Sequence, residues 1–452
     1  MAGGDHRTNE DERPDSVERP DSIERPDSVE RPDSVEQPDG VSRSDNPRAD
    51  RRGRRPPTVP RRLATAAAET DSLPTSVRAV LGYYADTGEL ALGSLELKRY
   101  VDRYVESVIE AAFDPVEAAL AEAFDVSRSQ VEFSYDTKLT LPAELTLSHL
   151  FGRIRAETTP RLNPITGELD AGPLGRLRAL GRDSPSRASL ADARERLGLV
   201  RDVTELVVVA LIDGDVRDAI NDEEYEDFEV GFSVDESDRA RVAEITQRTL
   251  EGRVRDLFAR FPDAVEDRYE EAVERSEAHQ DRDPYFRELM ERAAEGDEEA
   301  LAAVESEYKH AAFADPPALF DEAERQLPYL VTQYGRVGVI YHGMIEMYRA
   351  AGVEIEPAFE RSIVFAIVGA QIWLDDVDDY RADTAEGQLT PVTAEYLLAD
   401  SEAAARAAVV DVTEQYLGAA KEYAAATNSG LAGIGADYIR RSGSTDPLPG
   451  GE

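Results

Sequence analysis

The sequence predicts an all-α protein, and three observations support that prediction. Apolar residues recur at spacings of three and four through most of residues 71–441, as they do on the buried face of a helix. Residues 206–212 are apolar on all sides, and their flanks have the composition of helices. No alternation of strands with helices surrounds them. Only residues 131–141 alternate weakly, so a short strand is expected there.

The chain divides into three predicted parts. Residues 1–70 form a tail, because 12–39 repeat the hexapeptide Glu-Arg-Pro-Asp-Ser-Val and a proline every six residues prevents a long helix. One Val or Ile per repeat cannot build a core, which favours disorder over an ordered motif; a flexible docking tail or spacer is the functional alternative. Residues 71–441 form the helical domain. Residues 442–452 are a polar tail rich in Gly and Pro, predicted to be flexible.

The charge balance limits the classes of partner. The formal net charge is −42, with 93 Asp and Glu against 51 Lys and Arg, and only four of the basic residues are lysines. This acid excess is typical of salt-loving archaea and argues against a nucleic-acid partner for the folded domain, since phosphate contacts need basic patches. The arginine-rich segment 48–62 is compatible with peripheral contact to acidic lipids or polyanions. Ion pairing between these arginines and the acidic remainder of the same chain explains the segment equally well, and we favour that interpretation.

Other functional classes are excluded by residue content. The chain has no cysteine, which rules out disulfides, thiol catalysis and cysteine-ligated zinc. Its five histidines are dispersed, and none has a metal-ligand spacing such as HExxH. No apolar signal segment is visible, and no run approaches the ~18 apolar residues that span a bilayer. A cytoplasmic protein is therefore expected.

Several elements of the domain are predicted individually. Val and Ile in 206–212 favour a strand by propensity, but the flanks favour a buried helix. A long apolar helix is predicted over 327–351, and Pro357 suits the first turn of the next helix. Residues 392–441 should hold two helices with a break near Asn428. Residues 157–190, rich in Gly and Pro, should form a surface excursion.

The most informative stretch joins an apolar run to a group of acids. Residues 363–374 lead directly into five aspartates, Asp375, Asp376, Asp378, Asp379 and Asp383. In a continuous helix Asp375, Asp379 and Asp383 would climb one side and repel one another, at a helix end whose dipole already disfavours negative charge. A divalent cation would relieve this repulsion, and oxygen ligands select magnesium, manganese or calcium.

The alternative interpretation is an acidic surface helix of a salt-adapted protein. The turn before the aspartates is apolar on every side, which favours a helix that runs through the interior and ends in a cavity. Asp375, Asp376, Asp379 and Asp383 are therefore predicted metal ligands.

These residues resemble the second aspartate-rich motif of class I isoprenoid synthases. The chain has DDxxD within residues 375–379, then Gly387 and Pro391. Gln371 precedes the first aspartate by four residues, one more than in the trans-polyprenyl synthase motif. The pattern is also similar to that of squalene/phytoene synthases, although Gln388 replaces the arginine usual after their glycine. The resemblance implies an all-α barrel in which two facing aspartate-rich helices bind Mg²⁺ and an allylic diphosphate.

The same resemblance requires a first motif upstream. The best candidate lies around Asp213 and Asp218, with Asp222, after the apolar run 206–212. Gln371, Asp213, Asp218 and Arg336 are the predicted substrate-binding residues. His342 could line the same cavity, but a hydrogen-bonded core histidine is the favoured interpretation.

Two functions from different classes follow. The first is Mg²⁺-dependent ionisation of a prenyl diphosphate, followed by transfer, condensation or cyclisation. The second is a non-catalytic helical protein of the same fold that binds a partner, which the weak first motif favours. The sequence does not determine the oligomeric state.

Overall fold

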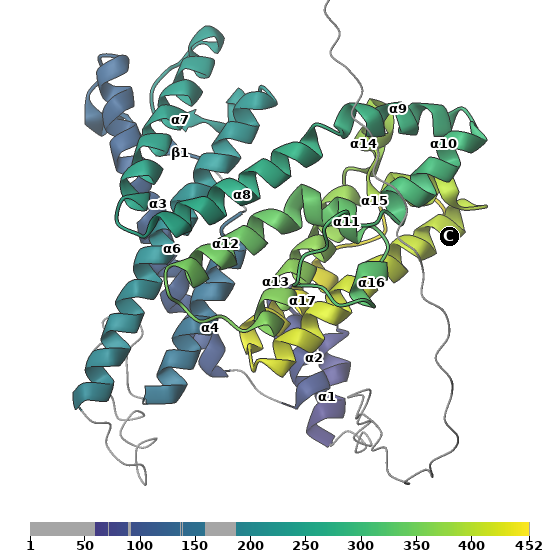
Figure 1. Ribbon diagram of the computed structural model, residues 1–452, viewed down its shortest axis with the longest axis horizontal. Coiled ribbons are helices and arrows are strands. Elements are labelled where there is room, and N and C mark those ends of the chain that lie inside the picture. The colour runs from purple at the N-terminus through teal and green to yellow at the C-terminus, as the bar shows by residue number, and fades with distance from the viewer. Residues whose placement is uncertain are drawn as a thin grey trace, which may run out of the picture. The chain divides into compact units, whose positions relative to one another are not determined.

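The computed structural model describes residues 59–70, 72–88, 92–135, 137, 139–158 and 187–451, all within one compact unit, residues 56–452. The predicted repeat tail and most of the predicted excursion at 157–190 lie outside the described residues. The described part is mostly helical, so the all-α prediction is confirmed (Figure 1). The α-helices are α1 (Val59–Ala68), α2 (Thr75–Thr87), α3 (Leu92–Ala123), α4 (Leu141–Thr158), α6 (Arg187–Asn221), α7 (Glu236–Phe258), α8 (Asp263–Gln280), α9 (Asp283–Ala294), α10 (Glu298–Ala303), α11 (Leu330–Gln333), α12 (Val339–Ala350), α13 (Pro357–Ala370), α14 (Tyr380–Glu386), α15 (Pro391–Leu398), α16 (Glu402–Ala426) and α17 (Gly430–Ser442).

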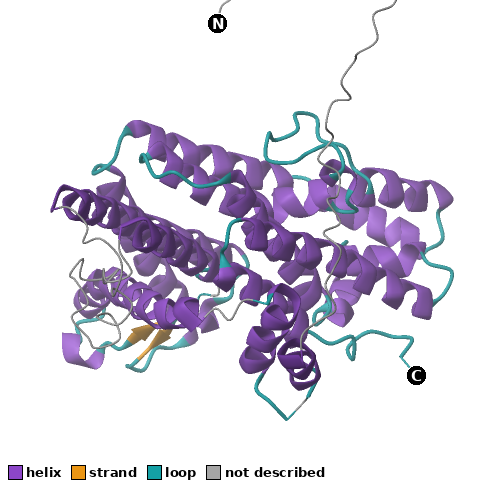
Figure 2. Ribbon diagram, turned by 90° about the horizontal axis from the view of Figure 1, so that it is seen from below, coloured by secondary structure: helices purple, strands orange, loops and turns teal. Residues whose placement is uncertain are grey.

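Shorter elements complete the chain. Three are π-helical turns, η3 (Val304–Lys309), η5 (Tyr334–Gly338) and η6 (Gln371–Asp376). Three are 3₁₀ turns, η1 (Arg128–Gln130), η2 (Tyr225–Asp227) and η4 (Glu324–Gln326). Strands β1 (Phe133–Ser134) and β2 (Glu229–Val230) pair antiparallel, with Phe133 opposite Val230 (Figure 2). The strand predicted within 131–141 is therefore present, and the strand that pairs with it was not predicted.

Two apolar cores share a pair of central helices. The first core joins α3, α4, α6 and α7, and the second joins α9, α13, α15, α16 and α17. Residues 206–212 of α6 are all buried, which confirms the predicted buried helix. α12 and α13 contribute to both cores: Phe359 and Ile363 belong to the first, and Val364 and Phe365 to the second. Side chains from α12 and α13 can therefore face cavities between the two cores.

Close approach of helices depends on small residues at two places. α8 packs on α12, where a Cβ on Gly343 would lie 2.4 Å from the Cβ of Ala272. A Cβ on Gly369 of α13 would lie 2.6 Å from Leu417 of α16. Both glycines let neighbouring helices meet at a separation that any larger residue would prevent.

Both predicted domain boundaries need correction. Residues 59–68, placed in the tail, form α1, which packs on α2; the carbonyl of Ala68 accepts a hydrogen bond from Arg441 at 2.9 Å. At the other end, Leu448 is 5% exposed and the Tyr396 hydroxyl donates to the carbonyl of Pro449 at 2.8 Å. Polar composition concealed both contacts, because one or two buried apolar side chains, Ala64 and Ala68 in α1 and Leu448 at the other end, anchor these short segments.

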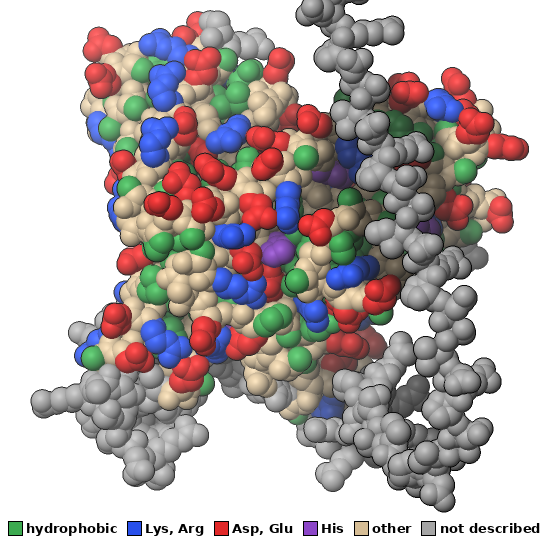
Figure 3. Space-filling model, viewed as in Figure 1, with side chains coloured by type: hydrophobic (Ala, Val, Ile, Leu, Met, Phe, Trp, Pro, Cys, Tyr) green, Lys and Arg blue, Asp and Glu red, His purple; other side chains and the backbone are tan. Residues whose placement is uncertain are grey.

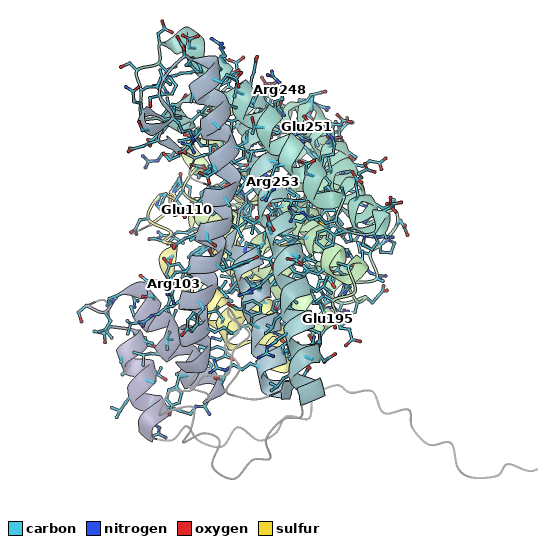
Figure 4. All side chains as sticks on the ribbon, turned by 90° about the vertical axis from the view of Figure 1, so that its left-hand side faces the viewer. Arg103, Glu110, Glu195, Arg248, Glu251 and Arg253 are labelled. Atoms are coloured by element: carbon cyan, nitrogen blue, oxygen red, sulfur yellow. The ribbon has the colours of Figure 1, made fainter. Side chains whose placement is uncertain are left out.

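The surface is highly charged. Figure 3 shows carboxylates spread across one face of the molecule among arginines. Figure 4 shows charged side chains of α3, α6 and α7, among them the exposed Arg103, Glu110 and Glu195. Within the described residues, none of the helices is long and apolar enough to cross a membrane.

Candidate functional site

The acidic segment does not form one continuous helix. η6 ends at Asp376, and α14 begins at Tyr380, with a turn between them. Backbone hydrogen bonds of 2.9 Å still join Asp379 N to Asp375 O and Asp383 N to Asp379 O, but Asp375 and Asp379 are exposed, whereas Asp383 is buried. The buried carboxylates are Asp376, at 1% exposure, and Asp383, at 9%. The break turns two of the acids inward and leaves the others at the surface.

Asp376 is paired on one oxygen only. Its Oδ1 accepts from Arg336 Nη1 at 3.0 Å and from Gln371 Nε2 at 3.4 Å. Gln371 also donates to Asp375. Asp376 Oδ2 is buried and has no hydrogen-bond partner among the described residues. Burial raises the pKa of Asp376 to about 6, even though Arg336 lowers it. A buried carboxylate oxygen without a donor is a position at which a cation could bind.

The neighbouring charges act on one another. Burial, and then the charge of Asp376, raise the pKa of Asp383 to about 7. Burial alone would weaken the charge of Arg336, but the carboxylates of Asp376 and Asp375 hold the pKa of Arg336 above its ordinary value. Asp375, Asp376, Asp379, Asp383 and Arg336 therefore lie close enough to interact electrostatically, as the sequence predicts for the four aspartates.

Arg336 also lines a polar cavity of about 120 Å³. α8 contributes His279 and Gln280, and α9 contributes Asp283 and Arg287. Burial, and then Arg282 and Arg336, lower the pKa of His279 to about 4, so its imidazole is neutral at pH 7. Tyr308, Phe286, Gln388 and Leu389 complete the lining. The cavity thus has two arginines, a neutral imidazole and several hydrogen-bonding groups.

Three π-helical turns meet at this site. Tyr308 lies in η3, Arg336 in η5, and Gln371 and Asp376 in η6. A π turn holds one residue more than an α turn and re-aims the side chains that it carries. Gly335 allows the close approach of His279, whose Nδ1 would lie 2.8 Å from a Cβ at that position.

The candidate first motif on α6 separates into two parts. Asp213, at 1% exposure, accepts from Gln247 at 3.0 Å on Oδ1 and from Arg217 at 2.9 Å on Oδ2. Both of its oxygens are satisfied, so Asp213 anchors α6 to α7, and its prediction as a substrate-binding residue is not supported by its contacts.

Asp215 and Asp218 instead border a mostly apolar cavity of about 130 Å³ between α6, α8 and α12. Val207, Leu211, Ile340, Met344 and Met347 form its apolar walls. Asp218 accepts a hydrogen bond from Gln280, and Gln280 lines both this apolar cavity and the polar cavity beside Arg336. Gln280 therefore connects the two acidic regions. Asp215 carries the raised pKa of a partly buried acid, about 6.

A further polar cluster lies away from the aspartates. In the described part of the chain, His342, Glu346 and Glu360 form the one group of three His, Asp or Glu residues whose possible metal-ligand atoms all lie within 4.8 Å of one another. They line a cavity of about 550 Å³. The prediction that His342 is a core histidine therefore misses its position at a cavity.

Sequence reasoning also missed His279, Asp283 and Arg287. His342 and Glu346 are four apart on one helix, which could have signalled a pair. Glu360 comes from the next helix, and the residues of the polar cavity come from separate elements, so no local spacing identifies them.

Comparison with family models, with curated proteins and with solved structures finds no match to this chain.

Proposed function

We propose that the protein is a divergent class I isoprenoid synthase that ionises an allylic prenyl diphosphate with Mg²⁺ and then transfers or cyclises the prenyl group. The observation that carries the proposal is the position of Gln280. This side chain lines the polar cavity that contains Arg336, the partner of Asp376. It also lines the apolar cavity bordered by Asp215 and Asp218. A diphosphate and an apolar chain need two such neighbouring compartments.

The η6 turn supports the resemblance on which the proposal rests. Gln371 stands one residue further from the aspartates than in trans-polyprenyl synthases. η6 runs from Gln371 to Asp376, and a π turn accommodates one extra residue within a helix. Gln371 still donates to Asp375 and Asp376 despite the extra residue. The departure in spacing is therefore compatible with the role that the motif implies.

The residues divide the proposed chemistry among them. Asp376, through its unpaired Oδ2, and Asp375, Asp379 and Asp383 would hold Mg²⁺, which supplies charge that stabilises the departing diphosphate. Arg336 and Arg287 face the polar cavity and would bind diphosphate oxygens. The apolar walls of the adjoining cavity would keep water away from the carbocation. His279, which is neutral and lines the adjoining polar cavity, would accept a proton from the carbocation.

A second candidate function has an observation of its own. Gly214 stands between Asp213 and Asp215, and Asp213 is occupied by Arg217 and Gln247. A first metal site weakened in this way favours a non-catalytic protein of the same fold that binds a partner. Peripheral membrane contact and cytoplasmic localisation remain predictions.

Release of diphosphate tests the enzymatic proposal. The full chain would be incubated in concentrated KCl with Mg²⁺ and farnesyl or geranylgeranyl diphosphate. We expect Mg²⁺-dependent release from the wild type. A double variant, Asp375→Ala with Asp379→Ala, should lower the rate by at least about 100-fold, because charge stabilisation of the leaving group is lost. Both residues are exposed, so the fold should survive.

The matched control removes the same number of acids from the same segment. Asp378→Ala combined with Glu386→Ala changes two exposed carboxylates that are not predicted ligands. This control should retain wild-type release. Absence of release from the wild type with either substrate would reject the enzyme and favour the non-catalytic alternative. Equal losses in both double variants would reject the assignment of Asp375 and Asp379.

A further inference from the structure

The 550 Å³ cavity adjoins the α8–α12 contact, as the apolar cavity does. Ala272 and Gly343, which meet at that contact, line both cavities. The larger cavity is otherwise bounded by α8, α12, α13 and residues 315–319. Neither its lining nor its polar groups include the aspartates of η6 and α14. A ligand bound in this cavity would therefore not be held by the residues of the proposed Mg²⁺ site.

His342 is oriented by a partner on one ring nitrogen and faces acids with the other. Its Nδ1 lies in hydrogen-bond contact with the Tyr334 hydroxyl. Its Nε2 lies 3.3 Å from Glu360 Oε1 and 3.9 Å from Glu346 Oε1. Because Tyr334 engages Nδ1, Nε2 is the ring nitrogen that is positioned to share an ion with the carboxylates.

Glu360 is the second observation that points to a ligand. It is 2% exposed, and its Oε1, which faces His342, has no hydrogen-bond partner among the described residues. Its Oε2 accepts from Arg349 Nη1 at 2.6 Å, and Arg349 also pairs with Glu346. Arg349 thus fixes both glutamates from one side and leaves the inner oxygen of Glu360 unpaired. A buried carboxylate oxygen without a donor has a high free energy unless a cation or proton binds it.

We propose that His342, Glu346 and Glu360 form a second site, for a divalent first-row transition metal ion. One imidazole nitrogen with two carboxylates suits Zn²⁺, Fe²⁺ or Mn²⁺ better than Mg²⁺, because imidazole is a poor ligand for Mg²⁺. The 3.3 Å between Nε2 and Oε1 is close to the separation of two ligands about 2.1 Å from one ion. The longer 3.9 Å to Glu346 needs only a small side-chain adjustment.

The surroundings match those of a metal ligand set. In the metal-bound tautomer, His342 Nδ1–H donates to the Tyr334 oxygen, which fixes the ring as the outer partners of ligating histidines do. Three protein ligands leave coordination positions free toward the cavity, as in catalytic metal sites. Arg275 and Arg268 line the same cavity, so a small anion is the class of molecule suited to those positions.

Titration with Co²⁺ tests the site. Chelator-treated full-length protein would be titrated in concentrated KCl and followed by the visible absorption of Co²⁺ and by calorimetry with Zn²⁺. We expect one ion per chain to give an absorption band that depends on His342, whereas Co²⁺ bound by the carboxylates of the proposed Mg²⁺ site does not require His342. His342→Gln and Glu360→Gln should abolish this band and the binding of this ion. Tyr334→Phe should weaken it by about 10–100-fold, as loss of an outer partner does.

Matched controls separate this site from the acidic surface and from the proposed Mg²⁺ site. His149→Gln removes another buried histidine that faces a glutamate, and Glu205→Gln removes a glutamate that pairs with two arginines. Both variants should bind Co²⁺ as the wild type does. The Asp375→Ala, Asp379→Ala double variant should also retain the Co²⁺ band, so failure of the proposed enzyme activity leaves this test intact.

Two results would overturn the proposal. Absence of stoichiometric Co²⁺ or Zn²⁺ binding in the wild type would mean that Arg349 alone neutralises the glutamates. An unchanged band in His342→Gln would place the bound ion elsewhere. Circular dichroism of each variant would confirm that loss of binding is not loss of fold.

Discussion

Asp213 and Asp376 come from the same sequence pattern and have different roles in the structure. Each follows a buried apolar run, each is 1% exposed, and each pairs with an arginine. Burial raises the pKa of each to about 6. However, both oxygens of Asp213 accept hydrogen bonds, whereas Asp376 Oδ2 accepts none. An acidic residue at the end of an apolar run therefore does not by itself identify a binding site. A carboxylate oxygen without a hydrogen-bond donor is what distinguishes Asp376 from Asp213.

The largest expected effect is a loss of diphosphate release when the partner of Asp376 is removed, compared with removal of a partner of Asp213. Arg336→Gln should reduce diphosphate release by about 10²–10³-fold, because a preorganised charge facing the leaving group is lost. Gln247→Ala, which removes a donor to Asp213, should leave the rate of the folded protein unchanged. Steady-state release by the two variants measures the difference.

A control matched in exposure accompanies this prediction. Arg253 is 29% exposed in its side chain, close to the 30% of Arg336, and pairs with Glu205 away from the site. Arg253→Gln should retain activity. If Arg336→Gln were as active as Arg253→Gln, Arg336 would have no role in substrate binding and the contrast with Asp213 would disappear.

A second prediction compares stabilities. Asp213→Asn should lower the free energy of unfolding by about 1–3 kcal/mol, because an amide group would place a donor against Arg217 or Gln247. Asp376→Asn should change it by less than about 0.5 kcal/mol, because the amide nitrogen can take the position of Oδ2, where no donor competes, while the remaining oxygen still accepts from Arg336. Denaturant unfolding at constant salt measures both. Equal losses would show that Asp376 is as fully satisfied as Asp213.

A third expected effect is a change in the pH dependence of stability. The folded-state pKa of Asp383, about 7, lies above the ordinary value of 3.8, so the folded protein binds more protons than the unfolded chain between these values. Asp383 therefore makes stability fall as the pH rises from about 4 to about 7. Asp383→Asn should flatten that fall by up to about 1.4 kcal/mol per pH unit.

Unfolding measured at several pH values tests this effect. Asp383→Asn should be more stable than the wild type at pH 7 and similar to it below pH 4. Saturating Mg²⁺ should shift the wild-type titration to lower pH, because a cation favours the ionised carboxylate. The same slope in both proteins would contradict the raised pKa of Asp383.

Local sequence patterns predicted much of the helical framework. The apolar run 206–212 identified a buried segment of α6, and Pro357 marked the start of α13. Asn428, with a φ of 54°, lies at the predicted break before α17. These features depend on side-chain period and on backbone preference, which neighbours in sequence largely determine.

Other expectations failed because they depended on contacts between distant residues. Residues 330–350 form the helix predicted over 327–351, and only its π turn η5 was not predicted. Residues 392–441 were predicted to hold two helices, but they also include all but the first residue of a third, α15. The predicted tails include α1 and the buried Leu448. Composition alone did not indicate which of these segments would find a partner.

By itself, the sequence determined an all-α fold and the acidic end of the apolar run, because helix periodicity and clustered charge are local properties. Only the tertiary structure determined which carboxylates are buried and which of these lack a hydrogen-bond donor. It turned Asp376 and Asp383 inward, satisfied Asp213 through Gln247 on another helix, and brought Glu360 to His342 from the next helix. Burial and hydrogen bonding are set by residues far apart in the chain, and these determine whether a carboxylate anchors a helix or is free to bind a cation.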